Sequence, residues 1–348
     1  MDNGAEEAPV VHNTADNRFE VHLDGDIAVL EYQLLLMKLS GIDGVIVDWY
    51  GSTSYNDYAV INQATAKLFE HIQKADMLFA ICYEDATIRT LVDQKKLDSD
   101  TVYAQGQADL QYLQATWFTQ PAYLKSSDRS VLFNFGPQYF INSIDWETLF
   151  SVLDARPVLV TLDKHWVGAS MATFPWPPMS ASVNGVLSQA NLENYLDAYY
   201  QKAANYKYRV GGAFPGFYDI YMAAGVRLSY GFLDAQDGKI FDLTLQKAIE
   251  QQPDVIQLIT WNDYGEGTMI EPTVEYEYRY LEMLQAAQAK LGNTDFKYTA
   301  DDLRLPFRLY QLRQQHGEDE SQTRLDKASA ALMAGDVKAA KKVLSSFP

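Results

Sequence analysis

The chain has 348 residues, of which 47% are hydrophobic and 21% are charged, so a large buried core is expected and global disorder is not. The formal net charge of −18 argues against nucleic acid as a partner, because an acidic surface repels phosphate backbones. The single cysteine, Cys82, excludes an intramolecular disulfide, a cysteine-based zinc cluster and a Cys-x-x-Cys redox pair.

The sequence gives no support to several other classes. The 5 histidines include no pair with metal-ligand spacing, so no metal site is expected. There is no P-loop, G-x-G-x-x-G or G-x-S-x-G motif, so neither a nucleotide cofactor nor a serine hydrolase triad is expected. No apolar stretch approaches the roughly 18 residues of a transmembrane helix. Met1–Pro9 lacks the pattern of a secretory signal, so either the protein stays in the cytoplasm or a signal has been removed.

Strand and helix patterns alternate along most of the chain. Strands are expected at Ile42–Asp48, Met77–Tyr83, Ser130–Phe135, Pro157–Leu162, Met171–Trp176, Arg209–Phe214 and Val255–Trp261. Helices are expected at Ile27–Leu39, Ala59–Lys74, Ala86–Val92, Thr101–Trp117, Trp146–Leu153, Leu192–Tyr206, Leu243–Gln251 and Val274–Leu291. Repeated β-then-α units favour parallel strands with helical crossovers. The leading architecture is an α/β (β/α)8 TIM-like barrel, and a doubly wound open sheet is the alternative.

The ends of the chain differ from this pattern. A first barrel strand should precede Ile27, and only Phe19–Leu23 alternates suitably, so residues 1–26 are an N-terminal segment with a candidate divergent first strand. Residues 27–291 would form the barrel and residues 292–348 a short C-terminal helical appendage. In that appendage Thr299–Gln314 is amphipathic, and a helical pair follows with Gly335 as the C-cap of its first helix.

Acids, amides and aromatic residues recur where the predicted strands end. In a barrel the carboxyl ends of the strands carry the functional groups. Reading those positions gives Asp48, Trp49, Tyr50, Glu84, Asn134, Asp163, Trp176, Tyr218 and Asp219 as candidate substrate-binding residues. Aromatic residues make up 13% of the chain, which suits a cleft that is both apolar and hydrogen-bonding, although a tyrosine-rich core would give the same excess. Asp48 and Glu84 could instead cap helices, and Asp163 could form a solvated pair with Lys164.

The last predicted strand runs into the motif Trp261–Pro272, which reads WNDYGEGTMIEP. Asp263 and Glu266 would lie between Trp261, Asn262 and Tyr264, and carboxylates on aromatic walls suit sugars. Rings of a sugar stack on aromatic faces, while two acids divide the proton transfers. A surface turn with ordinary acids is the alternative, because Asn, Asp and Gly are common turn formers.

This motif, with Asp43–Gly51, Tyr83–Asp85 and Gly212–Asp219, resembles the glycoside hydrolase family 71/99-like group over about residues 27–290. The E-G-T-x-I-E-P part resembles family 99, which are (β/α)8 endo-acting α-mannosidases and α-mannanases. The W-N-D-Y-G-E part resembles family 71, which are α-1,3-glucanases. The resemblance implies a carbohydrate substrate, no cofactor, an extracytoplasmic location and Glu266 as general acid/base.

Asp263 is the point at which the two resemblances differ, because family 99 has Glu there and family 71 has Asp. In family 99 the first acid is thought to deprotonate the sugar's own 2-hydroxyl, and in family 71 it is expected to help activate water. The hypothesis is a glycosidase that cleaves α-linked polysaccharide or glycan of the α-mannan or α-1,3-glucan type, with Asp263 and Glu266 as catalytic residues. A non-catalytic carbohydrate-binding protein on a degenerate barrel is the alternative. The sugar, the linkage, the stereochemistry and the oligomeric state stay open.

Overall fold

The computed structural model describes residues 27–348. Its helices are α1 Ile27–Ser40, α2 Tyr58–Lys74, α3 Ala86–Asp93, α4 Val102–Leu113, α5 Ser143–Phe150, α6 Gln189–Ala203, α7 Lys239–Glu250, α8 Arg279–Ala287, α9 Leu305–Gln315, α10 Asp319–Met333 and α11 Val337–Leu344. Its strands are β1 Gly44–Trp49, β2 Leu78–Tyr83, β3 Lys125–Ser126, β4 Arg129–Asn134, β5 Val158–Leu162, β6 Ala172–Phe174, β7 Val210–Ala213, β8 Phe217–Tyr218, β9 Phe232–Leu233 and β10 Val255–Leu258. None of these helices combines the length and apolar character that a membrane crossing needs.

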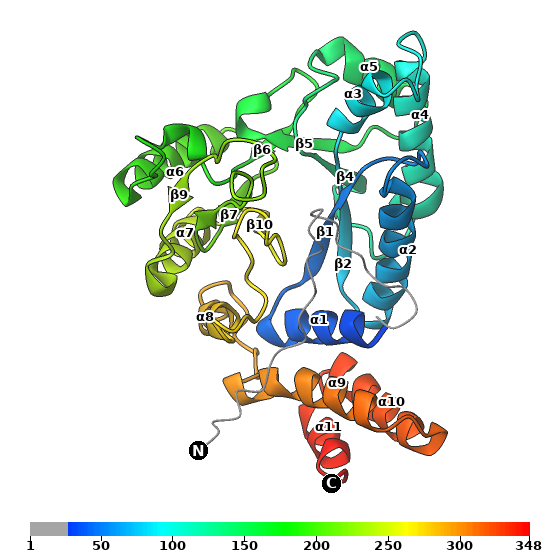
Figure 1. The fold of residues 1–348 in the computed structure, drawn as a ribbon, viewed down its shortest axis with the longest axis vertical. Helices are drawn as coiled ribbons and strands as arrows, with labels where there is room; N and C mark the ends of the chain where they lie inside the picture. The colour runs from blue at the N-terminus through cyan, green and yellow to red at the C-terminus, as the bar shows by residue number, and fades with distance from the viewer. Residues whose placement is uncertain (1–26) are drawn as a thin grey trace.

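The main strands run parallel, as the repeated β-then-α pattern predicts. β1, β2, β4, β5 and β6 form one ladder in that order, and β7 pairs in parallel with β10. β7 packs beside β6, so the two groups continue around one curved wall with α2 to α7 outside it (Figure 1). This confirms an α/β fold with a parallel sheet.

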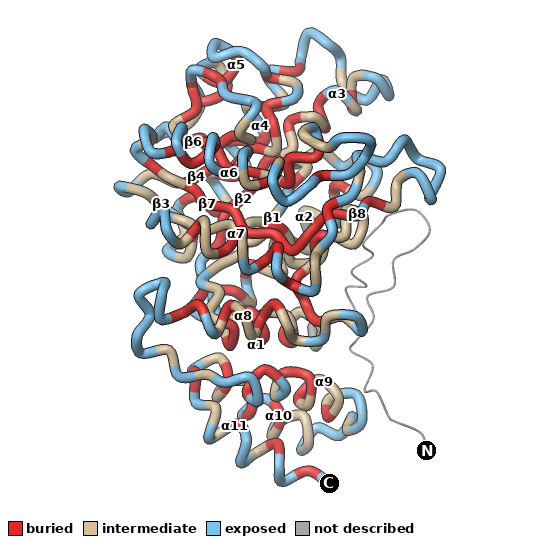
Figure 2. The backbone as a smooth tube through the Cα atoms, turned by 90° about the vertical axis from the view of Figure 1, so that its left-hand side faces the viewer, coloured by how far each residue is buried: buried red, intermediate tan, exposed pale blue. Residues whose placement is uncertain are grey.

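Side-chain alternation divides the strands between an inner and an outer core. Ala80, Cys82, Val131, Phe133, Val158, Val160, Ala172, Phe174 and Val210 meet in the inner core. The residues of opposite parity, such as Phe79, Ile81 and Leu132, pack outward against the helices. Figure 2 shows buried residues concentrated along β2, β4 and β7 and along α1 and α8. The strands therefore present a fixed set of side chains to the space that they enclose.

Within residues 27–348, β1 pairs only with β2 and β10 pairs only with β7, whereas the other two sheet ends, β6 and β7, pack beside each other. All four residues of β10 are half-buried, whereas all four of β7 are buried. The edges of β1 and β10 both line the same cavity, so the wall is open between them in the described part of the chain. The predicted first strand, Phe19–Leu23, lies outside the described residues. Closure of an eight-stranded barrel stays a prediction.

Residues 292–348 pack beneath α1. Leu312, Leu325 and Leu332 share one core with Leu35 of α1 and Leu284 of α8. Gly335 has a φ of +70°, in keeping with its predicted role at the end of α10, and Asp336 then caps α11 by accepting a hydrogen bond from the Ala339 N–H at 3.0 Å.

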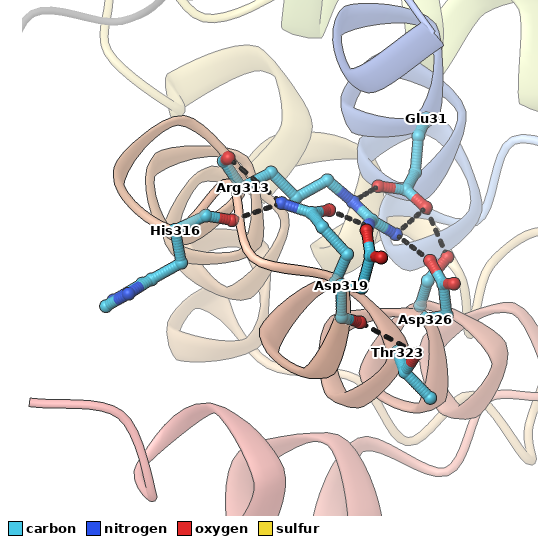
Figure 3. A network of polar contacts seen from close by, with 8 residues as sticks. Glu31, Arg313, His316, Asp319, Thr323 and Asp326 are labelled. Carbon is cyan, nitrogen blue, oxygen red and sulfur yellow. Dashed lines mark hydrogen bonds and ion pairs between the residues drawn. The ribbon is translucent and has the colours of Figure 1, made fainter.

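A polar network fastens this appendage to α1 (Figure 3). The Arg313 guanidinium of α9 donates two hydrogen bonds to the Glu31 carboxylate, at 2.7 and 3.0 Å, and a third to Asp326 at 3.0 Å. The Ser329 hydroxyl also donates to Glu31. The side chains of Arg313 and Glu31 are only 13% and 12% exposed, so this bidentate pair is well shielded from water.

Two predicted helices have different bounds in the structure, and three short strands are additional to the predicted ones. The helix expected at Val274–Leu291 begins only at Arg279, because Thr273–Glu277 forms a turn in which the Glu277 N–H donates to the Thr273 carbonyl at 2.8 Å. Glu277 there has a φ of +47°, which a helix does not accommodate. The helix expected at Thr101–Trp117 ends as α4 and continues as a π-helical turn over Gln114–Phe118. The short strands β3, β8 and β9 have only two residues each, too few for an alternating pattern.

Candidate active site

The loop after β10 is held by its own side chains. The Thr260 hydroxyl accepts a hydrogen bond from the Asp263 N–H at 2.9 Å and lies 2.9 Å from the Thr268 hydroxyl. The Asp263 carboxylate in turn accepts from the Glu266 N–H at 2.9 Å. Asp263 therefore fixes the turn that carries Glu266, and the D-x-x-E spacing of the sequence has a structural cause.

Two side chains from other loops hold the Glu266 carboxyl. The Trp176 indole N–H donates to Oε2 at 3.2 Å, and the Tyr221 hydroxyl donates to Oε1 at 3.3 Å. Trp176 follows β6, and Tyr221 lies in the loop that follows β8. These contacts leave Glu266 half-buried in a fixed orientation next to Asp263.

Two more acids approach from β1 and β2. Asp48 lies in β1 directly beside Cys82 of β2, and Glu84 follows β2 with its N–H donated to the Trp49 carbonyl at 3.0 Å. Asp48 is open to the cavity on one side and surrounded by protein atoms on the others. Burial and the nearby Asp263 charge raise the pKa of Asp48 to about 7. Burial, followed by the charges of Asp48 and Asp85, raises the pKa of Glu84 to about 9.

The acids of the β10 loop have different pKa environments. Burial and then the Asp263 charge raise the pKa of Glu266 to about 7, against the opposing hydrogen bonds from Trp176 and Tyr221. Burial also raises the pKa of Asp263, but the N–H groups of Glu266 and Gly265 oppose this by bonding its charged form. Glu266 thus holds a proton near neutral pH more readily than an ordinary glutamate, beside an acid whose charged form is hydrogen-bonded. A carboxyl group that is protonated near neutral pH can act as a general acid.

One cavity of about 1610 Å³ connects these groups. Of the residues predicted from the sequence, Asp48, Tyr50, Glu84, Trp176, Trp261, Asn262, Asp263 and Glu266 line it. The cavity continues from the carboxyl groups along the edges of β1 and β10, where apolar residues such as Val45 and polar residues such as Gln257 line it. Burial, followed by the charges of Asp48 and Glu84, raises the pKa of Tyr50, so its hydroxyl remains a donor beside them. The acids therefore lie together at one end of this cleft, which follows the open edge between β1 and β10.

Trp49 and Asn134 do not lie in this cleft, in contrast to the expectation from the sequence. Trp49 is 0% exposed, packs against Tyr83 and Tyr112 on the helix side of β1, and donates its indole N–H to Asn62 at 3.1 Å. The alternation of side chains along β1 turns Trp49 away from the face that carries Asp48. Asn134 is also fully buried and donates to the Tyr83 carbonyl at 2.7 Å. Both side chains support the strand ends from behind.

Four other predicted residues lie near the cleft but do not line it. Asp163 forms an ion pair with Lys202 at 3.0 Å. Asp219 is buried and accepts hydrogen bonds from the Tyr230 N–H at 2.5 Å and the Ser229 hydroxyl at 3.1 Å, so it closes its own loop. Tyr264 donates to Glu271 at 2.8 Å behind the β10 loop. Tyr218 is 64% exposed, and its N–H donates to the Glu266 carbonyl at 2.9 Å, which places its ring outside the cavity lining.

Sequence reasoning missed Tyr221 and Arg227 beside Glu266, and Glu271 behind the β10 loop. Tyr221 contacts the carboxyl group directly, and Arg227 stacks on the Tyr221 ring with 3.8 Å between guanidinium carbon and ring centroid. Glu271 is buried behind the loop, where burial raises its pKa to about 7 and Gln33 of α1 donates to it at 3.2 Å. The conspicuous Y-D-I-Y spacing around Tyr218 could have indicated Tyr221, whereas Arg227 lies in a stretch without any periodic signal.

Within residues 27–348, no group of three or more His, Cys, Asp or Glu side chains has an arrangement that could hold a metal ion. The chemistry that this arrangement can perform is proton transfer between carboxyl groups and a bound polar molecule. Acids with raised pKa values and aromatic walls in one cavity are the features of a site for polar ligands.

Comparison with known proteins gives similarity at the level of the fold. No protein-family model and no curated protein sequence matches the chain. Among solved structures, a family 99 endo-α-mannosidase from Bacteroides thetaiotaomicron with bound bis-tris-propane superposes with a TM-score of 0.56 and 17% identity, covering 77% of this chain and 86% of that one. A second structure of a family 99 endo-α-mannosidase from that organism gives a TM-score of 0.51 and 16% identity, covering 80% of both chains.

A third similar structure is described as a glycoside hydrolase-like protein. It has a TM-score of 0.56 and 13% identity, and the match covers 75% of this chain and 85% of that one. These identities are low, so the likeness concerns the arrangement of the strands and helices. The fold of this chain is therefore similar to that of family 99 glycoside hydrolases, as its sequence motifs indicate.

Proposed function

We propose that this protein is a glycoside hydrolase that cleaves α-linked polysaccharide or glycan of the α-mannan or α-1,3-glucan type. The observation that carries the proposal is the Glu266 carboxyl, which Trp176 and Tyr221 hold beside Asp263 in a large cleft. The likeness of the fold to family 99 structures supports it. In this proposal residues 27–291 carry the activity, and residues 292–348 form an appendage docked beneath α1. The family resemblance favours an extracytoplasmic location.

Glu266 is the general acid in this proposal. Its raised pKa of about 7 keeps the proton available for the leaving glycosidic oxygen at neutral pH. Asp263, with its charged form stabilised by two backbone N–H groups, is the base that acts on water or on a hydroxyl of the sugar itself. The pair thus divides protonation of the leaving group from activation of the nucleophile.

The rest of the cleft binds and orients the sugar. Asp48 and Glu84 lie where they can accept or donate hydrogen bonds to neighbouring hydroxyl groups, depending on their protonation. Trp176 and Trp261 line the cavity with aromatic surface on which sugar rings stack. Tyr218, which is exposed at the rim, would contact a ligand only outside the cavity.

The test is the release of sugars from α-mannan and from α-1,3-glucan by the wild-type chain and by Glu266→Gln. Gln keeps the size and the acceptor oxygen of Glu266 but cannot give up a proton, so turnover should fall by about 10²–10⁴-fold. The matched control is Glu275→Gln, which makes the same chemical change at an exposed position of the following segment and should leave turnover unchanged.

The outcomes of this experiment distinguish a hydrolase from a carbohydrate-binding protein and test the role of Glu266. Cleavage of one polymer that is lost only in Glu266→Gln supports the hydrolase and identifies the polymer class. Binding of a polymer without cleavage by the wild-type chain contradicts the enzyme and favours a carbohydrate-binding protein. Cleavage that is equal in both variants rules out Glu266 as the acid.

A further inference from the structure

The loop between β8 and β9 is fastened to the loop that carries Glu266. The Tyr218 N–H donates to the Glu266 carbonyl at 2.9 Å, and the Ile220 N–H donates to the Gly265 carbonyl at 3.0 Å. Within the first loop, the Val226 N–H donates to the Tyr221 carbonyl at 2.9 Å. These bonds set the backbone at Tyr221 relative to Glu266.

Arg227 packs against two aromatic rings in this loop, Tyr221 and Tyr230, whose centroids are 5.9 Å apart and whose planes are nearly perpendicular, at 84°. Its guanidinium carbon is 3.8 Å from the Tyr221 ring centroid and 3.5 Å from the Tyr230 ring centroid. Asp219 anchors the Tyr230 side of this cluster, because its carboxylate accepts the Tyr230 N–H at 2.5 Å. A cation on the face of tyrosine is attracted to the ring, so each ring restrains the guanidinium and the guanidinium restrains each ring.

The ring that Arg227 covers is the one whose hydroxyl reaches the catalytic acid. Tyr221 donates to Glu266 Oε1 at 3.3 Å, a bond that weakens if the ring rotates away. The other groups that face Glu266 are Trp176, which donates to Oε2, and Asp263 of its own loop. Asp48 and Glu84 line the same cavity from β1 and β2.

We propose that Arg227 is a positioning residue, which packs against Tyr221 and Tyr230, holds the Tyr221 hydroxyl on Glu266 and keeps a positive charge beside an acidic site. The inference rests on the proposed role of Glu266. The Arg227 charge favours the ionised form of Glu266 and so lowers its pKa relative to what burial alone would give. It thereby limits the increase in the pKa of Glu266 that burial and Asp263 cause.

The test compares Arg227→Met, Arg227→Lys and Tyr230→Leu in the full chain. Met removes the charge, Lys keeps the charge but loses the planar stack, and Leu removes the second ring without touching Glu266. Arg324→Met is the control, since Arg324 stacks on Phe347 at 4.2 Å in the C-terminal appendage. The readout is the titration of the Glu266 carboxyl by NMR of ¹³C-labelled glutamate, assigned from the signal missing in Glu266→Gln.

The expected result is a higher pKa of Glu266 in Arg227→Met and in Tyr230→Leu, with a smaller increase in Arg227→Lys and none in Arg324→Met. On a polymer that the wild-type chain cleaves, kcat should fall about two- to fivefold in Arg227→Met with KM unchanged, and the alkaline limb of the pH profile should move to higher pH. Unchanged titration of Glu266 in both Arg227→Met and Tyr230→Leu would overturn the proposal. If the pKa of Glu266 shifts in these variants but the wild-type chain cleaves no polymer, the positioning role of Arg227 is supported and the hydrolase function is rejected.

Discussion

Glu31 and Glu266 both lie in largely buried surroundings, but they have different partners. Glu31 receives two hydrogen bonds from the Arg313 guanidinium and joins α1 to the C-terminal appendage. Glu266 accepts hydrogen bonds from the neutral side chains of Trp176 and Tyr221. It forms no ion pair with another side chain among residues 27–348. One carboxyl group is neutralised by a cation, and the other is left to titrate.

Glu31 is therefore an acid that stabilises the folded protein. Glu266 belongs to a group of acids that do not stabilise the fold when they are ionised. Asp48, Glu84 and Glu266 all have raised pKa values, with burial as the first cause and a neighbouring acid as the second. A cluster of acids that raise one another's pKa destabilises the folded state when it ionises. Such clusters occur mainly where chemistry requires them.

The largest expected effect concerns the charge of Asp263. In Asp263→Asn the amide oxygen can still accept the Glu266 N–H, so the turn remains while the charge and the base are lost. Turnover should fall by about 10²–10⁴-fold. Because the Asp263 charge raises the pKa of Glu266, that pKa should also fall in the variant, which a titration of residual activity or of the Glu266 carboxyl measures. An unchanged turnover would remove Asp263 from the mechanism.

The second-largest expected effect concerns the contribution of the Glu31 carboxylate to the stability of the protein. Glu31→Gln leaves the Arg313 charge without its bidentate partner in a shielded place, so the free energy of unfolding should fall by about 3 kcal/mol. Glu147→Gln is the control, because the Glu147–Arg156 pair is 50% and 40% exposed. That variant should lose less than about 1 kcal/mol in the same urea unfolding experiment. Equal losses would show that the shielding of the Glu31 pair has no energetic consequence.

A third effect tests how closely the loops around Glu266 pack. Gly267 has a φ of +64°, and a Cβ there would lie 2.7 Å from the Tyr218 carbonyl oxygen. Gly267→Ala should therefore destabilise the protein by about 1–3 kcal/mol. Gly292→Ala is the matched control, since Gly292 has a φ of +87° but nothing within 4 Å of the added carbon. The difference in melting temperature between the two variants reports the contact of the added Cβ with Tyr218, since both glycines have a positive φ. Equal melting temperatures would mean that the loops around Gly267 move to accommodate the added carbon.

The last effect is gradual and depends on pH. A carboxyl whose pKa is raised in the folded state contributes stability below its unfolded pKa, and this stability is lost as the pH rises through the folded pKa. Glu84 has an ordinary value of 4.5 and a folded value of about 9, so its contribution should disappear between those two pH values. Urea unfolding of Glu84→Gln should show a flatter decline of stability over this range than the wild-type chain. If the stability of Glu84→Gln declines as steeply as that of the wild-type chain, Glu84 is not a source of the pH-dependent loss of stability.

The repeated strands and helices could be predicted from the sequence because each is a local pattern of apolar residues. Asp48, Glu84, Asp263 and Glu266 could be predicted to meet, since parallel strands place their carboxyl ends at one edge. Trp49 was assigned to the same edge although it follows Asp48 directly, and side-chain alternation places it on the opposite face. Attention to parity along β1 would have corrected that assignment.

Other features depend on contacts that no local pattern records. The Glu31–Arg313 pair joins residues separated by 282 positions. Tyr221 and Arg227 lie in a loop whose conformation is set by backbone hydrogen bonds to the Glu266 loop and by the Asp219 anchor, neither of which has a periodic signature. The closing strand expected at Phe19–Leu23 falls outside the described residues, so the architecture between β1 and β10 is still a prediction.

The most direct test measures stability and hydrolysis side by side at pH 8 in Glu266→Gln and Glu31→Gln. In Glu266→Gln a charge is removed from a buried site while the acceptor oxygen stays, so hydrolysis should be lost and the free energy of unfolding should be equal to or higher than that of the wild-type chain. In Glu31→Gln unfolding should become easier, while turnover per folded molecule is retained. A Glu266→Gln chain that hydrolyses normally, or a folded Glu31→Gln chain without turnover, would contradict the division between the two carboxyl groups.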